Sequence, residues 1–594
     1  TKHLLLFTIG PVQSFIAQAR KTQDLYAGSK LLSDLIECAI KALPQGSEVI
    51  FPAKNIQSKP NRFLAVINNA DLTIGKAIEK TVKDKFLEIT NNSYGNKPLN
   101  FDDQIKNFLD INWVILPYEE EKYKETYKEI EKTLGAIKNV RAFNQLDELG
   151  RKCSLCGERN VLFYKECSEC KKGNKEKHEC TYNKVKLKPN WKNFDDNNFE
   201  DQEIKTKIHH YNNSLVDVPG TKVQSGEGLC AVCFTKRFYK PCHSELVSES
   251  FPSTAEIALM ESLKHLDSSL LSQYKDLFKS YTFDEQLYFD ENLTEAYFKK
   301  NGLEGLKDQL PEIKKKNEEI KKATKDKGLK LNKYYAIIAL DGDKMGKWLS
   351  GELIQDISKL KDFHHKLSSK LGTYAGNVKT YIKEDDGSGK LVYSGGDDVL
   401  AFVNLNHLTD VLEELRTNFP DFGGTEESSA SCGVAIAHYK IPLGEVLKRA
   451  RKMEKAAKEK GNRNAFGIAV LKHSGEIEET VFKWGESQAS IGLLSDLIDH
   501  LKKEEFSNTF IKSLNVELHR LMNDEGKIDN HKADDIIDTE LKRLLIRSRN
   551  ESKGITKDKA IELAEKIFSL FKSKSNDVQN FLSFLNIADF LTGR

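Results

Sequence analysis

The sequence has no long hydrophobic run and no excess of either charge. Its apolar stretches are short, such as YYAIIAL at 334–340, and fall far below the roughly 20 residues that cross a bilayer. The N-terminal TKHLLLFTIG lacks the three-part layout of a signal peptide. With 91 basic and 89 acidic side chains the formal net charge is +2, so no global field draws the whole molecule onto nucleic acid. We therefore expect a cytoplasmic protein without membrane contact, in which any binding of nucleic acid is local.

Cysteine is also scarce, with 10 residues in a chain of 594, and its distribution is unlike that of a disulfide framework. Eight of the ten lie between 153 and 242, whereas Cys38 and Cys432 stand alone in apolar surroundings. Clustering of this kind favours metal binding over disulfide bonds.

Two pairs within this cluster have the spacing of zinc knuckles, Cys153-x-x-Cys156 and Cys230-x-x-Cys233. The two thiolates of one pair can bind a Zn²⁺ ion, and both pairs together complete its tetrahedral coordination in a single closed, structural site. A second set with zinc-like spacing consists of Cys167, Cys170, His178 and Cys180. The alternative for this second set is a disordered, thiol-rich loop. Neither set is expected to be catalytic, because full coordination leaves no open position.

The hydrophobic pattern divides the chain into five segments and predicts an α+β multidomain protein. Residues 1–150 and 333–475 both alternate strand-like and helix-like stretches, which indicates two α+β units and a distant internal duplication. Residues 151–255 carry the cysteine cluster and fit a metal-bound insertion. Residues 256–332 are helical and end in a linker, and residues 476–594 have the pattern of a helical bundle.

An acidic turn stands out in the second α+β unit. The stretch LVYSGGDDVLAFV at 391–403 places two glycines, Asp397 and Asp398 between two β-prone runs. Glycine and aspartate are common in tight hairpins, so this stretch alone fits both a structural turn and a metal-binding turn. The buried strand YYAIIAL, however, runs directly into Asp341. An acid at the end of such a strand is costly unless something compensates its charge.

If the hairpin pairs beside that strand, Asp397 and Asp398 meet Asp341 at one edge of the sheet. Three neighbouring carboxylates repel one another unless divalent cations lie between them. Mg²⁺, or Mn²⁺ in its place, prefers such oxygen ligands, and two ions about 4 Å apart activate a hydroxyl and stabilise a leaving pyrophosphate. The expected reaction is attack by a ribose hydroxyl on the α-phosphate of a nucleoside triphosphate. Because successive strand residues face opposite sides, Asp397 and Asp398 need not both be ligands.

A basic helix in KAAKEKGNRNAF ends at Gly461, with Lys458 in its last turn. Basic residues in that position commonly offset the helix dipole. The alternative role for Lys458 is a point charge on the β and γ phosphates of the substrate.

These motifs share an order that resembles the palm of GGDEF-type nucleotide cyclases and polymerases: strand-DGD, helix, strand-GGDD-strand, SASCG at 429–433, and helix AKEKGNRN. The chain departs from the cyclase signature at Val399, where a Glu-Phe pair would be expected. Three further stretches extend the resemblance: HLLLFTIGPVQSFIAQARKTQDLYAGSKLLSDL, KCSLCGERN with GLCAVCFTKR, and FPSTAEIAL. With them, most of the chain resembles the large CRISPR polymerase subunit of type III effector complexes, in the Cmr (type III-B) branch.

The resemblance implies two ferredoxin-like palms, a zinc-bearing helical domain between them and a C-terminal helical domain. It also implies synthesis of 3′,5′-linked cyclic oligoadenylates from ATP when the complex binds target RNA. The implied partners are CRISPR RNA, target RNA and the smaller Cmr subunits. In the family the two palms form a composite nucleotide pocket, with GGDD in the second palm.

By position, Asp341, Asp397 and Asp398 would be catalytic and hold Mg²⁺, and Lys458 would contact the triphosphate. The first palm lacks a GGDD and would bind an acceptor nucleotide. The other expected nucleotide-binding residues are Gly395 and Gly396 and, in the first palm, Ser14, Arg20, Asp24, Gly28 and Ser29, close to Tyr26. An ordinary helix that ends at a glycine turn is the alternative for the first-palm set.

Three alternatives to this function remain open from the sequence. The same palm chemistry could join AMP from ATP to S-adenosylmethionine, because the sequence does not define the acceptor. The chain could also be a catalytically silent scaffold that binds guide RNA, although the intact acidic residues argue against this. A diguanylate cyclase is disfavoured, since it needs no zinc module or second palm.

None of the 14 histidines is followed by Asp, so we expect no HD nuclease activity.

Overall fold

The computed structural model divides the chain into two compact units. The first consists of Thr1–Phe251 with Gly346–Thr373, and the second of Pro252–Met345 with Tyr374–Arg594. The structure describes all residues except 1, 55, 57, 69–71, 94–96, 99, 141–147, 149, 166–185, 188, 190, 196–197, 219–221, 225, 241–250, 486–488, 524–527, 529–532, 574–576 and 594.

The first unit is built on a four-stranded antiparallel sheet with the order β2-β3-β1-β4. The strands are β1 (Lys2–Gly10), β2 (Glu48–Phe51), β3 (Arg62–Asn68) and β4 (Asp110–Tyr118). The helices are α1 (Gln13–Ala17), α2 (Thr22–Lys41), α3 (Leu72–Ser93), α4 (Phe101–Lys106) and α5 (Tyr123–Asn139).

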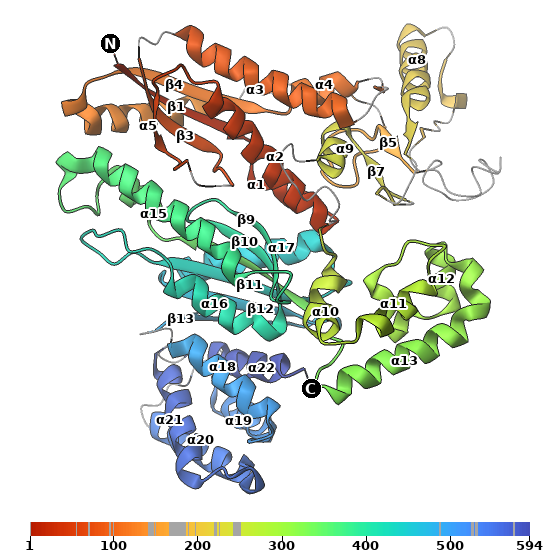
Figure 1. Ribbon diagram of the computed structural model, residues 1–594, viewed down its shortest axis with the longest axis vertical. Coiled ribbons are helices and arrows are strands. Elements are labelled where there is room, and N and C mark those ends of the chain that lie inside the picture. Colours follow the sequence, from red (N-terminus) through yellow and green to blue (C-terminus); the bar gives the residue numbers. More distant parts are fainter. Residues whose placement is uncertain are drawn as a thin grey trace. The chain divides into compact units, whose positions relative to one another are not determined.

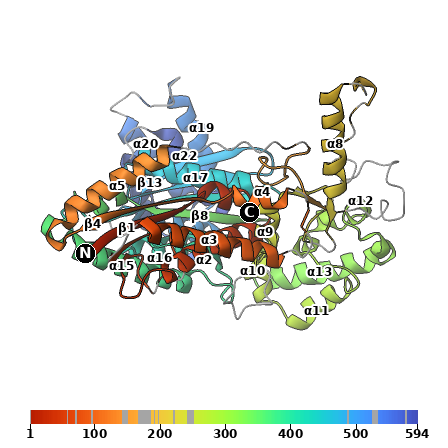
Figure 2. The ribbon, with the colours of Figure 1, turned by 90° about the horizontal axis from the view of Figure 1, so that it is seen from above.

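The central strand β1 is apolar on both faces because helices cover the sheet on both sides. Leu4 and Leu6 pack against Tyr127 and Ile130 of α5. Side chains alternate along a strand, so Leu5 and Phe7 point to the other face. Figure 2 shows α2 and α3 on the side of the strands opposite to α5.

The cysteine-bearing part of the first unit holds a small sheet as well as helices. Its strands are β5 (Phe163–Tyr164), β6 (Val216–Asp217) and β7 (Gly228–Leu229), in the order β6-β5-β7, and its helices are α8 (Phe199–Ser214) and α9 (Ala231–Phe238). The expectation of a helical insertion is therefore corrected. The strand before the second cysteine pair forms hydrogen bonds with the chain that follows the first pair, with Leu162 N–H donating to the Leu229 carbonyl at 2.9 Å.

The second unit is built on a six-stranded sheet with the order β13-β12-β11-β8-β10-β9. Neighbouring strands are antiparallel except β11 and β12, which are parallel. The strands are β8 (Tyr334–Gly342), β9 (Gly389–Ser394), β10 (Val399–Asn404), β11 (Ala430–His438), β12 (Ala465–Leu471) and β13 (Ile477–Lys483). Four helices lie between these strands along the chain. They are α14 (Met345–Ser350) and α15 (Leu360–Tyr381), most of whose residues belong to the first unit, and α16 (Leu408–Thr417) and α17 (Leu443–Glu459) of the second unit.

The two sheets share their strand order, as expected of a duplicated unit. Each sheet places its first strand, β1 or β8, between its third and its fourth strand, with its second strand at the edge. Figures 1 and 2 show α16 and α17 on opposite faces of the second sheet.

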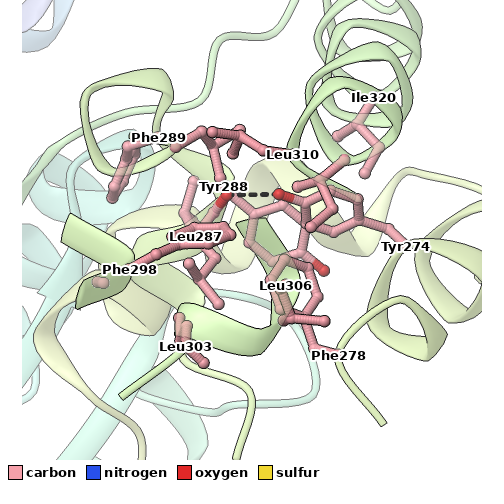
Figure 3. Close-up of a cluster of buried hydrophobic side chains, with 14 of the residues drawn as sticks. Tyr274, Phe278, Leu287, Tyr288, Phe289, Phe298, Leu303, Leu306, Leu310 and Ile320 are labelled. Carbon is pink, nitrogen blue, oxygen red and sulfur yellow. Dashed lines mark hydrogen bonds between the residues drawn. The ribbon is translucent and has the colours of Figure 1, made fainter. Parts of the chain in front are cut away.

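The helical segment after Pro252 has an apolar core of its own (Figure 3). Buried aromatic rings such as Tyr274, Phe278 and Tyr288 form this core, and the Tyr274 hydroxyl donates to the Leu287 carbonyl at 2.6 Å. Tyr439, which follows β11, belongs to the same cluster and so joins the segment to the second sheet. The helices are α10 (Thr254–Lys264), α11 (Ser268–Asp276), α12 (Glu295–Lys300) and α13 (Leu310–Asp326).

The C-terminal helices cover the edge strand of the second sheet. They are α18 (Ala489–Lys502), α19 (Thr509–Leu521), α20 (Ala533–Ser548), α21 (Lys557–Lys572) and α22 (Val578–Leu591). The Asn580 side chain of α22 accepts from Val481 N–H at 2.7 Å and donates to the Val481 carbonyl at 3.0 Å, so it satisfies backbone groups of β13. Within the described residues, no helix is long and apolar enough to cross a membrane.

Helix α17 lies unusually close to the sheet because glycines face it. A Cβ atom at Gly433 of β11 would lie 2.1 Å from the Ala450 carbonyl oxygen, and one at Gly467 of β12 would lie 2.8 Å from the Met453 carbonyl oxygen. Such distances are far below van der Waals contact, so only glycine allows the helix backbone to rest on these strands. The glycine of the SASCG stretch therefore determines where α17 places its side chains.

We expect Gly433→Ala to destabilise the second unit by about 1–3 kcal/mol, because the added methyl group overlaps the backbone of α17. The matched control is Gly492→Ala in α18, where a Cβ atom meets nothing within 4 Å. This substitution should raise the free energy of unfolding by about 0.5–1 kcal/mol. Urea unfolding of both variants, followed by circular dichroism, measures the difference. A Gly433→Ala variant as stable as the parent chain would contradict the close approach of α17.

Candidate functional site

The end of β8 and the GGDD turn lie side by side. Leu340 of β8 pairs with Val399 of β10, and Gly342 N–H donates to the Asp397 carbonyl at 3.1 Å. Gly395 N–H donates to the Asp398 carbonyl at 3.0 Å and closes the turn. Gly396 has a φ of +116°, which a residue with a side chain rarely adopts. The hairpin expected around GGDD is confirmed, and it brings Asp397 and Asp398 beside the end of β8.

The three carboxylates interact strongly. Burial, with repulsion from Asp341 and Asp398, raises the pKa of Asp397 to about 7, and burial raises the pKa of Asp398 to about 6. Burial also raises the pKa of Asp341, although the neighbouring Lys458 opposes the shift. Such shifts mean that the ionised cluster is short of positive charge. Hard divalent cations are the natural complement of these oxygens.

Helix α17 supplies two basic side chains to the cluster. The Lys458 ammonium forms an ion pair with Asp341 and lies 3.1 Å from Glu454. The Arg451 guanidinium lies 2.7 Å from Glu454 and 3.5 Å from Asp398. Arg451 also donates to the Tyr393 hydroxyl at 2.5 Å, and that hydroxyl donates to Asp398 at 2.8 Å. Asp341 is thus paired with Lys458, and Asp398 lies near Arg451.

Sequence reasoning identified Lys458 but missed Arg451, Glu454 and Tyr393. The signal for two of them was present, because residues 451, 454 and 458 follow one another at helical spacing and therefore share a face of α17. The carboxylates that these side chains contact could not be predicted, because the contacts depend on the close approach of α17 to the sheet that Gly433 allows.

Asp343 has a different role from the three carboxylates. It is buried and accepts hydrogen bonds from the hydroxyls of Ser429 and Ser431, each at 2.8 Å, and from Asn464 N–H at 2.9 Å. The turn at Asn462, Arg463 and Asn464 has positive φ at all three residues, so its backbone needs such an anchor. Asp343 therefore ties the DGD, SASCG and GNRN stretches together.

The first-palm candidates lie around α1 and α2 of the first unit. Ser14 and Arg20 are exposed, whereas Gly28 and Ser29 are buried in α2, and Tyr26 stacks on Phe251 with ring centroids 5.3 Å apart.

Asp24 is fully buried and already has partners. Its carboxylate accepts from Arg20 N–H and Lys21 N–H, each at 3.1 Å, and from two nitrogens of Arg237. Burial would raise the pKa of Asp24, but the hydrogen bonds and charge of Arg237 hold it below its usual value. The structure thus gives Asp24 a partner that sequence reasoning did not name.

The four knuckle cysteines converge in the first unit. The sulfur atoms of Cys153, Cys156, Cys230 and Cys233 all lie within 4.8 Å of one another, and Cys156 Sγ is 3.8 Å from Cys230 Sγ. A tetrahedral zinc site with Zn–S bonds near 2.3 Å separates its sulfurs by about 3.8 Å, so the cluster fits Zn²⁺. The second cysteine set (Cys167, Cys170, His178 and Cys180) lies outside the described residues.

Two family models match the chain at its two large sheets. The model of the second palm domain of Cas10/Cmr2 matches residues 334–467, which hold the three carboxylates. The model of the N-terminal region of the CRISPR-associated protein Cmr2 matches residues 4–91. Both matches are to domains of the Cas10/Cmr2 family, which the chain resembles in these two regions. The resemblance predicted from the GGDD palm and the N-terminal stretch is confirmed in these two regions.

One curated relative and two solved structures are similar to the chain. The CRISPR system Cmr subunit Cmr2 of Pyrococcus furiosus is 26% identical over 580 residues, which cover 81% of this chain and 63% of that relative. The chain thus spans less than two thirds of the length of the curated relative. A type III-B Cmr-beta structure bound to cognate target RNA matches with a TM-score of 0.61 at 12% identity, covering 100% of this chain and 83% of the other. The apo Cmr-beta structure also gives 0.61, at 13% identity, covering 99% and 82%.

We expect Asp397→Asn to stabilise the protein at pH 8 in the absence of Mg²⁺ and Mn²⁺, by about 1–3 kcal/mol after allowance for solvent screening. The pKa of Asp397 rises from its ordinary 3.8 to about 7 in the folded chain, so its ionised form destabilises the fold. This penalty is complete above about pH 7 and disappears as the pH falls towards 4.

Thermal unfolding between pH 5 and pH 8 measures the effect, with the exposed Asp499→Asn as control. A gain that does not shrink at pH 5, or an equal gain in the control, would contradict the electrostatic origin.

Proposed function

We propose that the chain is the nucleotidyltransferase subunit of a type III-B CRISPR effector complex and makes cyclic oligoadenylates from ATP when target RNA binds. One observation carries the proposal: Asp341, Asp397 and Asp398 lie together at the end of β8 although burial and repulsion raise their pKa values. No need of the fold accounts for such a costly cluster. The match of residues 334–467 to the second palm domain of the family supports the same conclusion.

The carboxylates of Asp341, Asp397 and Asp398 would hold Mg²⁺ or Mn²⁺, whose oxygen preference they fit. The bound ions would supply positive charge where the ribose 3′-hydroxyl attacks the α-phosphate and pyrophosphate leaves. Arg451 and Tyr393 would orient the Asp398 carboxylate. Both donate hydrogen bonds to this carboxylate, and Arg451 also donates to the Tyr393 hydroxyl. Lys458, free to leave Asp341 once a divalent ion neutralises that carboxylate, would donate to the β and γ phosphates.

The rest of the proposal concerns the other parts of the chain. The strand orders β2-β3-β1-β4 and β9-β10-β8-β11 support two ferredoxin-like palms, of which the first would bind the acceptor nucleotide near the exposed Ser14 and Arg20. Backbone groups at Gly395 and Gly396 would approach the nucleotide bound at GGDD. The cysteine cluster would hold a structural Zn²⁺ ion. CRISPR RNA, target RNA and the smaller Cmr subunits would be the partners, in the cytoplasm.

The test is to incubate the assembled complex with Mg²⁺, labelled ATP and matching target RNA, and to identify the products by mass spectrometry. Oligoadenylates should form with the parent chain and with Asp499→Ala, and should be absent from the Asp397→Ala, Asp398→Ala double variant. A product that appears only when S-adenosylmethionine is added would replace polymerisation by conjugation. No product from an intact, target-bound complex would favour a silent scaffold.

We expect Lys458→Met to lower kcat/KM for ATP by about 10- to 100-fold, the value of one charged hydrogen bond to phosphate. Most of the loss should lie in KM if Lys458 binds the triphosphate equally in the ground and transition states. Lys455→Met, at an exposed position one turn earlier on α17, is the control. Equal kinetics for the two variants would remove Lys458 from the site.

A further inference from the structure

Two basic side chains in the last turn of α9 are buried in the first unit. Lys236 is 0% exposed and Arg237 is 2% exposed. Burial of a charge costs several kcal/mol unless partners compensate it fully. The identity of these partners therefore shows what α9 is built to hold.

Arg237 uses every nitrogen of its guanidinium. Nε and one terminal nitrogen donate to the two oxygens of Asp24, the latter at 2.8 Å. The other terminal nitrogen donates to Glu227 and to the Lys222 carbonyl, each at 2.9 Å. Asp24 and Glu227 are themselves buried. Asp24 stands in the first turn of α2 and also accepts from the backbone of Arg20, so Arg237 fixes the start of this helix.

Lys236 holds the neighbouring helix α1. Its ammonium donates to the Phe15 carbonyl at 2.6 Å and to the Gln18 carbonyl at 2.5 Å, and it lies 4.6 Å from the centre of the Phe15 ring. These carbonyls belong to the last turn of α1 and the residue after it. A Cβ atom at Gly28 would lie 3.0 Å from the Lys236 side chain, so glycine leaves room for this contact.

The other end of α9 belongs to the cysteine cluster. Cys230 caps the helix, with its sulfur accepting from Cys233 N–H at 3.4 Å, and Cys233 lies in the first turn. A helix of eight residues does not persist by itself in water. Its position therefore depends on contacts outside the helix. The Phe234 ring stacks on Phe163 with ring centroids 3.9 Å apart, and the two ends are held by the metal-ligand cluster and by the Lys236 and Arg237 contacts.

We propose that Lys236 and Arg237 are positioning residues. They couple metal binding at the four-cysteine cluster to the position of residues 13–24, which form α1 and the start of α2 in the first unit. A metal ion bound by the four sulfurs holds α9, and α9 in turn holds both helices that flank the exposed Arg20. Loss of the metal loosens this segment while leaving the sheet itself folded. The consequence for the acceptor nucleotide rests on the proposed function, but the coupling itself does not.

Hydrogen exchange of the full chain, read by mass spectrometry, tests the coupling without any catalytic readout. Removal of zinc by a chelator should accelerate exchange in residues 13–24 by at least about fivefold, the lower end of usual coupling energies. The β1 and β3 amides should keep their rates. Arg237→Gln, with its zinc content measured, should show the same local acceleration in the zinc-loaded chain. The exposed Lys240→Gln should behave like the parent chain.

Coupling is reciprocal, so a substitution in α2 that breaks the contact with Arg237 should also weaken zinc binding. Asp24→Asn should raise the dissociation constant for zinc, measured by competition with a chelator, by at least about fivefold. Asp103→Asn, at an exposed position of α4, is its control.

Three results would each overturn the proposal: unchanged exchange in residues 13–24 after chelation, unchanged zinc affinity in Asp24→Asn, or equal acceleration throughout β1 and β3, which would mean global unfolding. Absence of nucleotide products with the coupling intact would count against the proposed function alone.

Discussion

Burial and mutual repulsion of the three carboxylates at the end of β8 are the constraint that the arrangement around the second sheet has to meet. The pKa values of Asp397 and Asp398 rise to about 7 and 6 because burial and neighbouring charge both oppose ionisation. The fold meets this cost with basic side chains delivered by a single helix, α17. Lys458 faces Asp341 and Arg451 faces Asp398, with Glu454 between them. The fold thus tolerates a charge arrangement that lowers its stability.

The fold could be predicted where local signals agree with one another. The GGDD turn separates two β-prone runs, so their pairing as a hairpin was predicted from the sequence. The pairing of this hairpin with the apolar run of β8 was only a condition of the argument, and the structure meets it. The same reasoning failed for Arg451 and Tyr393, although they contact the site. Their role depends on the depth at which α17 sits on the sheet, and this depth is fixed by missing side chains at Gly433 and Gly467.

The metal cluster and the first unit show a second limit of sequence reasoning. The four cysteines were predictable because the knuckle spacing carries its own geometry. The Asp24–Arg237 pair was not, since its members are 213 residues apart and no spacing rule connects them. Asp24 was predicted only as a candidate nucleotide-binding residue, and its partner Arg237 came from the three-dimensional fold alone.

Asp343 separates what the fold needs from what the chemistry needs. Its hydrogen bonds to Ser429, Ser431 and Asn464 hold three stretches of chain in register, whereas Asp397 and Asp398 contribute repulsion. A descendant that lost nucleotide chemistry would be under no pressure to keep the GGDD acids and would gain stability by shedding them, yet it would have to retain Asp343 and its serines. Survival of this anchor after decay of the neighbouring acids would therefore be the evolutionary mark of a palm that has become a scaffold.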